Sequence, residues 1–123
     1  MKLTLYFFLN TPKLIINEST SYPGTLREVI KPLIDVGSNQ SHLYAISPER
    51  VDPGNKSYGV KNTPRVVGGL SDQARDAAVA FYKSFCDEVI PVSSAEVAEA
   101  AKLFENTFRF IKWSIHFFIF QRP

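Results

Sequence analysis

The sequence predicts an α/β fold built on a largely parallel sheet. Short β-branched runs alternate with stretches whose apolar residues recur at the i, i+3, i+4 spacing of a helix. The extended runs are flanked by polar, Gly or Pro residues, as buried strands are. The 123 residues are 45% hydrophobic and 21% charged, which is ordinary for a globular domain that buries a core. Strands that alternate with helices typically pair in parallel, which gives this fold class.

The first predicted strand is Lys13–Asn17, a β-branched run that ends in a polar stretch. Pro23 and Gly24 then mark a turn. The next stretch has apolar residues at helical spacing, namely Leu26, Val29, Ile30, Leu33 and Ile34. Pro32 lies inside it, so we expect this helix to kink or to end early.

The second and third predicted strands are Leu43–Ile46 and Arg65–Gly69. Between them, residues 48–64 are rich in Pro, Gly, Asn and Lys and show no period. A loop of that length in a small domain is usually functional or mobile.

Two further helices follow. Ser71 is expected to cap the first, whose apolar face comprises Ala74, Ala77, Ala78, Phe81, Tyr82 and Phe85. Residues 89–92 form a fourth extended stretch. Ser93 and Glu96 have the spacing of a capping box for the last helix. We expect that helix to bury Val97, Ala100, Ala101, Phe104, Phe108 and Ile111.

Composition excludes several classes of function. A net charge of +2 with scattered basic residues argues against nucleic acid. The single cysteine, Cys86, excludes an internal disulfide, and with only two histidines no metal site is expected.

The apolar start, residues 1–9, has no signal-peptide cleavage site, and the aromatic stretch 110–120 is too short to cross a bilayer. We therefore expect a cytoplasmic protein that does not enter a membrane. The aromatic tail needs a covering partner, unless it is not the native continuation of the chain.

Three polar clusters are candidates for chemistry. Residues 18–25 follow the first strand, and open α/β sheets bind ligands at the carboxyl ends of their strands. This cluster can hold a nucleotide or sugar, or it can be a helix cap and turn. Residues 47–55 follow the second strand, where an acid can act as a base or belong to a solvated ion pair.

The third cluster is Lys102 with Asn106, which the i, i+4 spacing places on one face of a helix, three residues after Glu99. A lysine and an amide aimed together suit the stabilisation of a developing oxyanion. The alternative is an ordinary solvent-facing stripe.

Taken in order, these strings resemble the UDP-glucose/GDP-mannose dehydrogenase family, with similarity from Thr11 to Arg109. The matching strings are ESTSYPGT at 18–25, SPERVDPGN at 47–55, PRVVGG at 64–69 and VSSAEVAEAAKLFENTFR at 92–109. Their wording is most similar to the branch of UDP-N-acetylglucosamine and UDP-N-acetylmannosamine 6-dehydrogenases.

The resemblance implies a partial Rossmann-like sheet and an oxidoreductase that uses NAD. Such enzymes oxidise the C6 alcohol of a UDP-sugar to a carboxylate in two hydride transfers, through an aldehyde level held on a cysteine, for polysaccharide biosynthesis. Ser19, Thr20 and Ser21 match the loop that approaches the cofactor, and Thr20 would orient the catalytic water or a sugar hydroxyl. Glu49 matches the family's acid, which acts as base in hydrolysis. Arg50 matches the segment that lines the substrate site.

The same resemblance gives Lys102 and Asn106 the stabilisation of the C6 oxyanion and a place in the substrate site. The departures are equally informative. The sequence has no G-x-G-x-x-G phosphate cradle, and Cys86 lies outside the family's nucleophile motif and is interpreted as a small buried residue. Pro53 stands where another branch has a second glutamate.

Similarity ends after Arg109, where FIKWSIHFFIFQRP looks like the product of a frameshift or truncation. We therefore expect a fragment. Residues 1–92 would be the C-terminal part of an NAD-binding domain, and 93–123 the start of a central-domain helix with a divergent tail from about 110. Full-length relatives would oligomerise through that helix. We expect no activity from the chain alone; the alternatives are a half that complements a separately encoded partner, or a nucleotide-sugar binding module.

Overall fold

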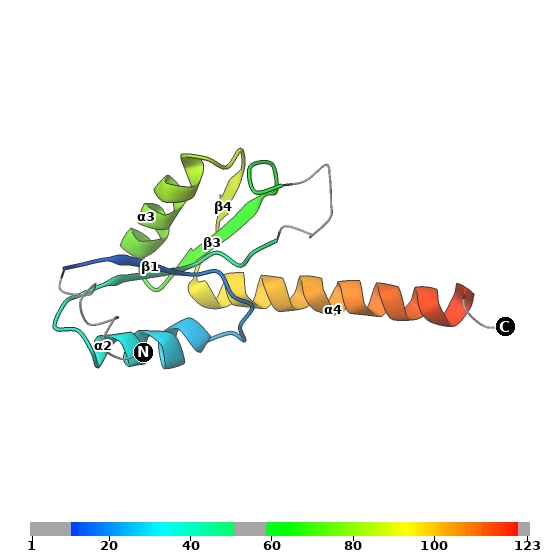
Figure 1. Ribbon diagram of the computed structural model, residues 1–123, viewed down its shortest axis with the longest axis horizontal. Helices are drawn as coiled ribbons and strands as arrows, with labels where there is room; N and C mark the ends of the chain where they lie inside the picture. The colour runs from blue at the N-terminus through cyan, green and yellow to red at the C-terminus, as the bar shows by residue number, and fades with distance from the viewer. Residues whose placement is uncertain (1–10, 51–58, 121–123) are drawn as a thin grey trace.

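The computed structural model describes residues 11–50 and 59–120 and has a four-stranded sheet at its centre (Figure 1). The strands are β1 (Leu14–Asn17), β2 (Leu43–Ile46), β3 (Arg65–Gly69) and β4 (Val89–Pro91), paired in that order. The α/β class and the four predicted strands are confirmed. The central part of the predicted loop 48–64, including Pro53, lies outside the described residues.

The sheet is mostly parallel, with one exception. β1 pairs with β2, and β3 with β4, in parallel, whereas β2 and β3 run antiparallel with Ala45 opposite Gly69. Antiparallel neighbours can be joined at one end of a sheet, without a crossover. As a result Arg65, the first residue of β3, lies at the end of the sheet where β1 and β2 finish.

Helices cover both faces of the sheet (Figure 1). α3 (Asp72–Lys83) packs on one face, where the buried residues are Ala45, Val67, Ala78, Tyr82 and Cys86. The other face carries the short helix η1 (Leu26–Ile30), which continues as α2 (Lys31–Asp35), and the start of α4 (Ala95–Phe120). Its buried residues are Leu26, Tyr44, Ile46, Ala95 and Ala98. Alternate side chains of β2 therefore serve two separate cores.

The irregularity expected at Pro32 takes the form of a change of helix type. η1 is a turn of π-helix in which the Lys31 N–H bonds to the Leu26 carbonyl, and α2 begins at Lys31 with Pro32 in its first turn. A proline has no N–H to donate and fits the first turn of a helix, where that donor has no intrahelical partner.

Ser71 caps α3 as predicted, since its Oγ accepts the Ala74 N–H at 3.1 Å. The predicted apolar face of α3 is right in part. Ala74, Ala78 and Tyr82 are buried, whereas Phe81 and Phe85 are 51% and 41% exposed.

The predicted cap and buried face of α4 are wrong. Ser94, not Ser93, accepts the Val97 N–H, because the helix begins one residue later than the capping-box spacing suggests. The residues that pack on the sheet are Ala95 and Ala98, while Phe104 and Phe108 are 76% and 66% exposed. Small side chains allow close approach, and Gly68 contributes to it, since a Cβ there would lie 2.4 Å from the Ser94 carbonyl oxygen.

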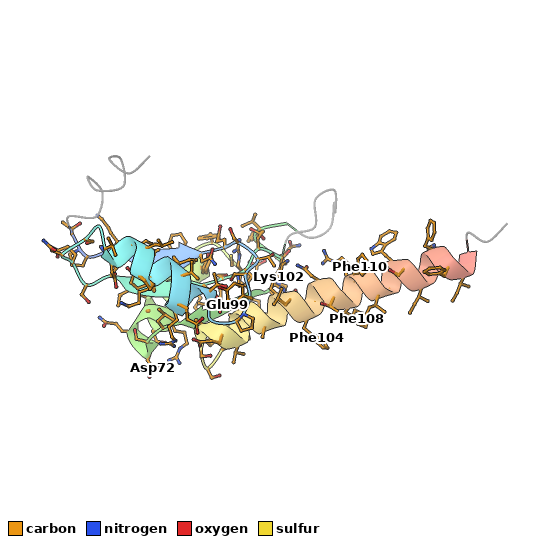
Figure 2. The ribbon with its side chains drawn as sticks, turned by 90° about the horizontal axis from the view of Figure 1, so that it is seen from below. Asp72, Glu99, Lys102, Phe104, Phe108 and Phe110 are labelled. Atoms are coloured by element: carbon orange, nitrogen blue, oxygen red, sulfur yellow. The ribbon has the colours of Figure 1, made fainter. Side chains whose placement is uncertain are left out.

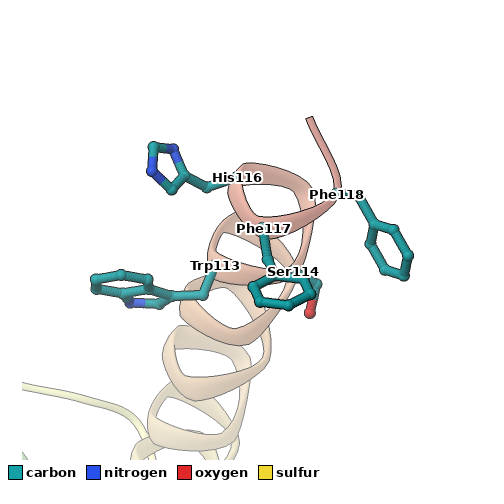
Figure 3. Close-up of a pocket in the computed structure, with 5 residues that line it drawn as sticks. All are labelled: Trp113, Ser114, His116, Phe117 and Phe118. Carbon is teal, nitrogen blue, oxygen red and sulfur yellow. The ribbon is translucent and has the colours of Figure 1, made fainter. Parts of the chain in front are cut away.

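Beyond its first turns α4 extends past the sheet as one continuous helix (Figures 1 and 2). The divergent tail is therefore helical as far as Phe120. Five side chains at this far end line an open hollow of about 370 Å³, and all belong to α4: Trp113, Ser114, His116, Phe117 and Phe118 (Figure 3). In the described part of the chain, no helix combines the length and the apolar character needed to cross a membrane.

Candidate functional site

A cluster of four polar side chains joins the carboxyl ends of β1 and β2 to the start of β3. Its centre is Arg65, whose side chain is only 5% exposed. One guanidinium nitrogen lies 2.8 Å from Glu18 Oε1 and another 2.8 Å from Glu49 Oε2. The Tyr82 hydroxyl donates to Glu18 at 2.6 Å, and the guanidinium lies 4.8 Å from the centre of the Tyr82 ring. Arg65 thus fixes the two carboxylates relative to each other.

The antiparallel β2–β3 pairing makes this cluster possible, because it brings a buried arginine to the sheet end where both acidic loops begin. Burial, and then the hydrogen bond to Glu18, raise the pKa of Tyr82, so its phenol remains a donor above the pH at which an exposed tyrosine ionises.

A second group of contacts comes from the polar stripe of α4, which we define as Glu99, Lys102 and Glu105. Lys102 Nζ donates to the backbone carbonyl of Glu49, and Glu105 forms an ion pair with Arg50. Glu99 is fully buried and accepts hydrogen bonds from the loop after β1. Lys102 and Phe104 leave the helix on opposite sides (Figure 2). The polar stripe therefore faces the two loops, and Phe104 faces away from them.

The structure brings together three of the predicted site residues. Glu49, Arg50 and Lys102 are in contact or share a partner helix, and the Arg50 N–H donates to Glu49 Oε1 at 2.8 Å. Arg50 Nη1 also donates to the Pro64 carbonyl at 3.3 Å. Asn106 lies one helical turn after Lys102 and is half-buried.

The predicted cofactor loop divides into two parts. Ser19 and Thr20 are exposed at the end of β1, where the Ser19 N–H donates to Asn17 Oδ1 at 3.1 Å. Ser21 is half-buried and donates to Glu99 Oε1 at 3.2 Å. The hydroxyls of Ser19 and Thr20 are thus accessible to a ligand, whereas Ser21 connects the loop to α4.

A hollow of about 650 Å³ lies beside β1 on the α3 face. Its polar end is formed by Glu18, Glu49, Arg65 and Tyr82, and its apolar wall by Leu14, Ile16, Val60, Phe81 and Phe85. Phe81 on α3 and Phe85 just after it belong to this wall, which explains why neither is in the core.

Sequence reasoning gave no site role to Arg65, Tyr82 or Glu99. A signal existed for Arg65, since a charged residue that opens an otherwise apolar strand must be compensated when it is buried. Glu99 carried a similar signal, because it lies beside Ala98 on the face of α4 made of small residues. The described residues contain no group of three or more His, Cys, Asp or Glu side chains arranged to hold a metal ion. Cys86 is buried, as predicted, and its Sγ contacts the Val60 carbonyl at 3.5 Å.

Comparison with known proteins identifies the class to which this fold belongs. The model of the NAD binding domain of the UDP-glucose/GDP-mannose dehydrogenase family matches residues 3–86. The UDP-N-acetyl-D-mannosamine dehydrogenase of Methanocaldococcus jannaschii is 37% identical over 103 residues, which are 83% of this chain and 23% of the relative. The UDP-N-acetyl-D-glucosamine 6-dehydrogenase of Pseudomonas aeruginosa is 34% identical over 101 residues, 78% of this chain and 24% of the relative.

Solved structures agree. The UDP-D-ManNAc dehydrogenase of Pyrococcus horikoshii superposes with a TM-score of 0.76 at 32% identity, over 88% of this chain and 27% of that one. The UDP-N-acetyl-mannosamine dehydrogenase of Staphylococcus aureus gives a TM-score of 0.67 at 35% identity, over 81% of this chain and 24% of that one.

The fold is therefore that of a Rossmann-type dehydrogenase domain. The chain belongs to the UDP-glucose/GDP-mannose dehydrogenase family. It spans about a quarter of the length of the curated relatives it matches.

The matched domain is the family's NAD-binding domain, so NAD is the cofactor that this fold serves. Ser19 and Thr20 offer exposed hydroxyls at the carboxyl end of β1, where α/β sheets bind ligands. The chain has no G-x-G-x-x-G cradle for the pyrophosphate.

Proposed function

We propose that this chain carries the water-activating and oxyanion-stabilising side of the active site of an NAD-dependent UDP-sugar 6-dehydrogenase. The substrate is a UDP-N-acetylhexosamine, whose C6 hydroxyl is oxidised to the uronate for polysaccharide biosynthesis in the cytoplasm. One observation carries the proposal: Lys102 bonds to the backbone of Glu49, whose carboxylate Arg65 holds in place. A cation and an acid from distant parts of the sequence therefore meet at one end of the sheet. The relatives' names supply the substrate class.

Each residue has a role that its position supports. The Lys102 ammonium and the Asn106 amide, one turn apart on α4, stabilise the negative charge that develops on the C6 oxygen. Glu49 takes a proton from the water that hydrolyses the covalent intermediate. Thr20 orients that water or a sugar hydroxyl from the exposed loop. Arg50 lines the substrate site. NAD, when bound, supplies the acceptor for the hydride.

The isolated chain should not turn over. It has no phosphate cradle, and its cysteine is buried against the Val60 carbonyl. The test is the formation of NADH by the purified chain with NAD and either UDP-N-acetylglucosamine or UDP-N-acetylmannosamine. We expect no NADH above the level of a Lys102→Ala control. Substrate-dependent turnover would contradict the claim that this set of residues is insufficient.

The residue roles are tested by a chimera. Residues 11–109 replace the matching segment of the P. aeruginosa enzyme, and NAD reduction is measured. We expect an active chimera in which K102A lowers kcat about 10²- to 10³-fold, the usual cost of removing one oxyanion donor. A folded chimera that binds NAD but is inactive, or a K102A variant with unchanged kcat, would contradict the proposal.

A second candidate is that the chain complements a separate polypeptide. It is supported by the hollow beside β1, the terminal strand of the described sheet, and by the exposed Phe81 and Phe85. Co-expression with the preceding segment of a relative should then give a complex that survives gel filtration. A third candidate, a nucleotide-sugar binding module using Thr20 and Glu49, predicts heat on titration with UDP-N-acetylglucosamine. The absence of heat would exclude it.

A further inference from the structure

Glu99 is the feature of the described structure for which the proposed roles offer no explanation. It is 0% exposed, yet it lies on the face of α4 that otherwise packs small apolar residues on the sheet. Burying a carboxylate costs several kcal/mol unless hydrogen bonds compensate it. An apolar residue of similar volume would fill the same space without that cost. The carboxylate therefore needs a reason other than packing.

Its hydrogen bonds give that reason. Oε1 accepts from Ser21 Oγ at 3.2 Å and from the Leu26 N–H at 3.0 Å, and Oε2 accepts from the Gly24 N–H at 2.6 Å. These donors are 78, 73 and 75 residues away in sequence. All three belong to residues 21–26, where Gly24 turns the chain with φ +97°. Both carboxylate oxygens are thus used to hold one turn.

We propose that Glu99 is a positioning residue, which fixes the loop after β1 relative to α4 and so sets Thr20 relative to Lys102. This inference rests on the proposed function of those two residues. Glu99 forms no hydrogen bond or ion pair with either of them. It acts through Ser21, next to Thr20 in sequence, and through its place one turn before Lys102 on the same face of α4.

The polar stripe therefore connects α4 to both active-site loops. Glu99 holds residues 21–26, and Lys102 holds the backbone of Glu49. Because both loops are bonded to α4, the loop after β1 and the loop after β2 are fixed relative to each other. Catalytic groups must be placed to within about 1 Å, since a displacement of that size can cost about 10²-fold in rate.

The first experiment measures amide hydrogen exchange by NMR in the chain itself, for the wild type, E99Q and the control E96Q. Glu96 also reaches from α4 to η1, through an ion pair with Arg27, but that pair is on the surface. The E99Q substitution keeps the shape of the side chain and replaces one acceptor by a donor. We expect exchange at Gly24 and Leu26 to accelerate at least about tenfold in E99Q, the result of losing roughly 1.4 kcal/mol of local protection. Exchange in β2 and throughout E96Q should be unchanged.

Unchanged exchange at Gly24 and Leu26 in E99Q would overturn the proposal, as would equal acceleration at all amides, which would indicate a general stabilising role. If E99Q does not fold, E99D replaces it, since it keeps the charge and shortens the reach. The same selective acceleration is then expected, and uniform acceleration or none overturns the inference.

The effect of Glu99 on catalysis is measured separately, in the chimera. There E99Q should lower kcat about 10²-fold, because the loop that carries Thr20 is displaced relative to Lys102. Full kcat in E99Q would overturn the positioning role. An inactive parent chimera would contradict the proposed function alone, because the exchange measurement needs no substrate and no turnover.

Discussion

At the scale of single residues, Arg65 determines the geometry of the site. Its buried guanidinium holds Glu18 and Glu49, and the two carboxylates keep about half of their surface in water. Water can therefore hydrate them when the arginine is removed, which limits the loss of unfolding free energy. A hydrogen bond to a charged group contributes about 1.5–3 kcal/mol.

We expect R65M to lower the free energy of unfolding by about 1.5–3 kcal/mol, measured by urea denaturation. The matched control is R75A, since Arg75 also bridges two acids, Asp72 and Asp76, but at the surface. Its effect should stay within about 1 kcal/mol. Equal effects of the two substitutions would show that burial of Arg65 does not matter.

Two buried tyrosines make stability depend on alkaline pH. Burial first, then hydrogen bonds to Glu18 and Asp35, raise the pKa of Tyr82 and the pKa of Tyr44. The unfolded chain releases these protons near pH 10, whereas the folded chain retains them. Their contribution is therefore complete below about pH 10 and is lost as the pH rises further. In urea titrations, Y82F should reduce this alkaline loss, and Y44F should do so independently. A wild-type midpoint that is constant above about pH 10 would contradict this.

At the scale of elements, α4 shows where sequence patterns fail. Val97, Phe104 and Phe108 have helical spacing, and that spacing predicted the buried face. The helix instead packs through Ala95 and Ala98, because close approach to β3 requires small side chains. Periodicity identifies a stripe of apolar residues, but it cannot identify what covers the stripe. The cap of α3 and the four strands were predictable because they depend on neighbouring residues alone.

The two faces of α4 should respond in opposite ways to substitution. A98L adds bulk against the sheet and should cost about 1–3 kcal/mol of unfolding free energy. F104S and F108S remove exposed apolar surface, so they should leave that free energy within about 0.5 kcal/mol and reduce self-association. Urea denaturation and light scattering measure the two quantities. A larger loss of stability in F108S than in A98L would show that Phe108 is buried, as the sequence predicted.

At the scale of the whole molecule, the fold class was predictable and the direction of one strand was not. Alternating strands and helices predicted a parallel sheet, and two of the three strand pairs are parallel. The reversed β3 depends on the path of the chain between Ile46 and Arg65, which has no periodic signal. The reversal brings Arg65 to the same end of the sheet as Glu49. The sequence motifs therefore predicted Glu49 and Lys102 as site residues, but not the arginine that holds Glu49.

The far end of α4 extends away from the sheet, and residues 110–119 are exposed or half-exposed there (Figure 2). Deletion of residues 110–123 should therefore leave the unfolding midpoint of the sheet within a few degrees, by circular dichroism, and should lower aggregation. A collapse of the midpoint would show that the tail contributes to the core after all.

Gly68 offers a way to adjust the site from outside it. A methyl group at this position would meet the Ser94 carbonyl oxygen at 2.4 Å, so the start of α4 would have to move away from β3. Glu99 and Lys102 lie in the next turns of α4, so both would move with the helix. The G68A substitution thus adds one carbon between β3 and α4, the helix that carries both Glu99 and Lys102. The relative placement of the two loops that Glu99 and Lys102 hold therefore depends on a hydrogen atom at a position outside both loops.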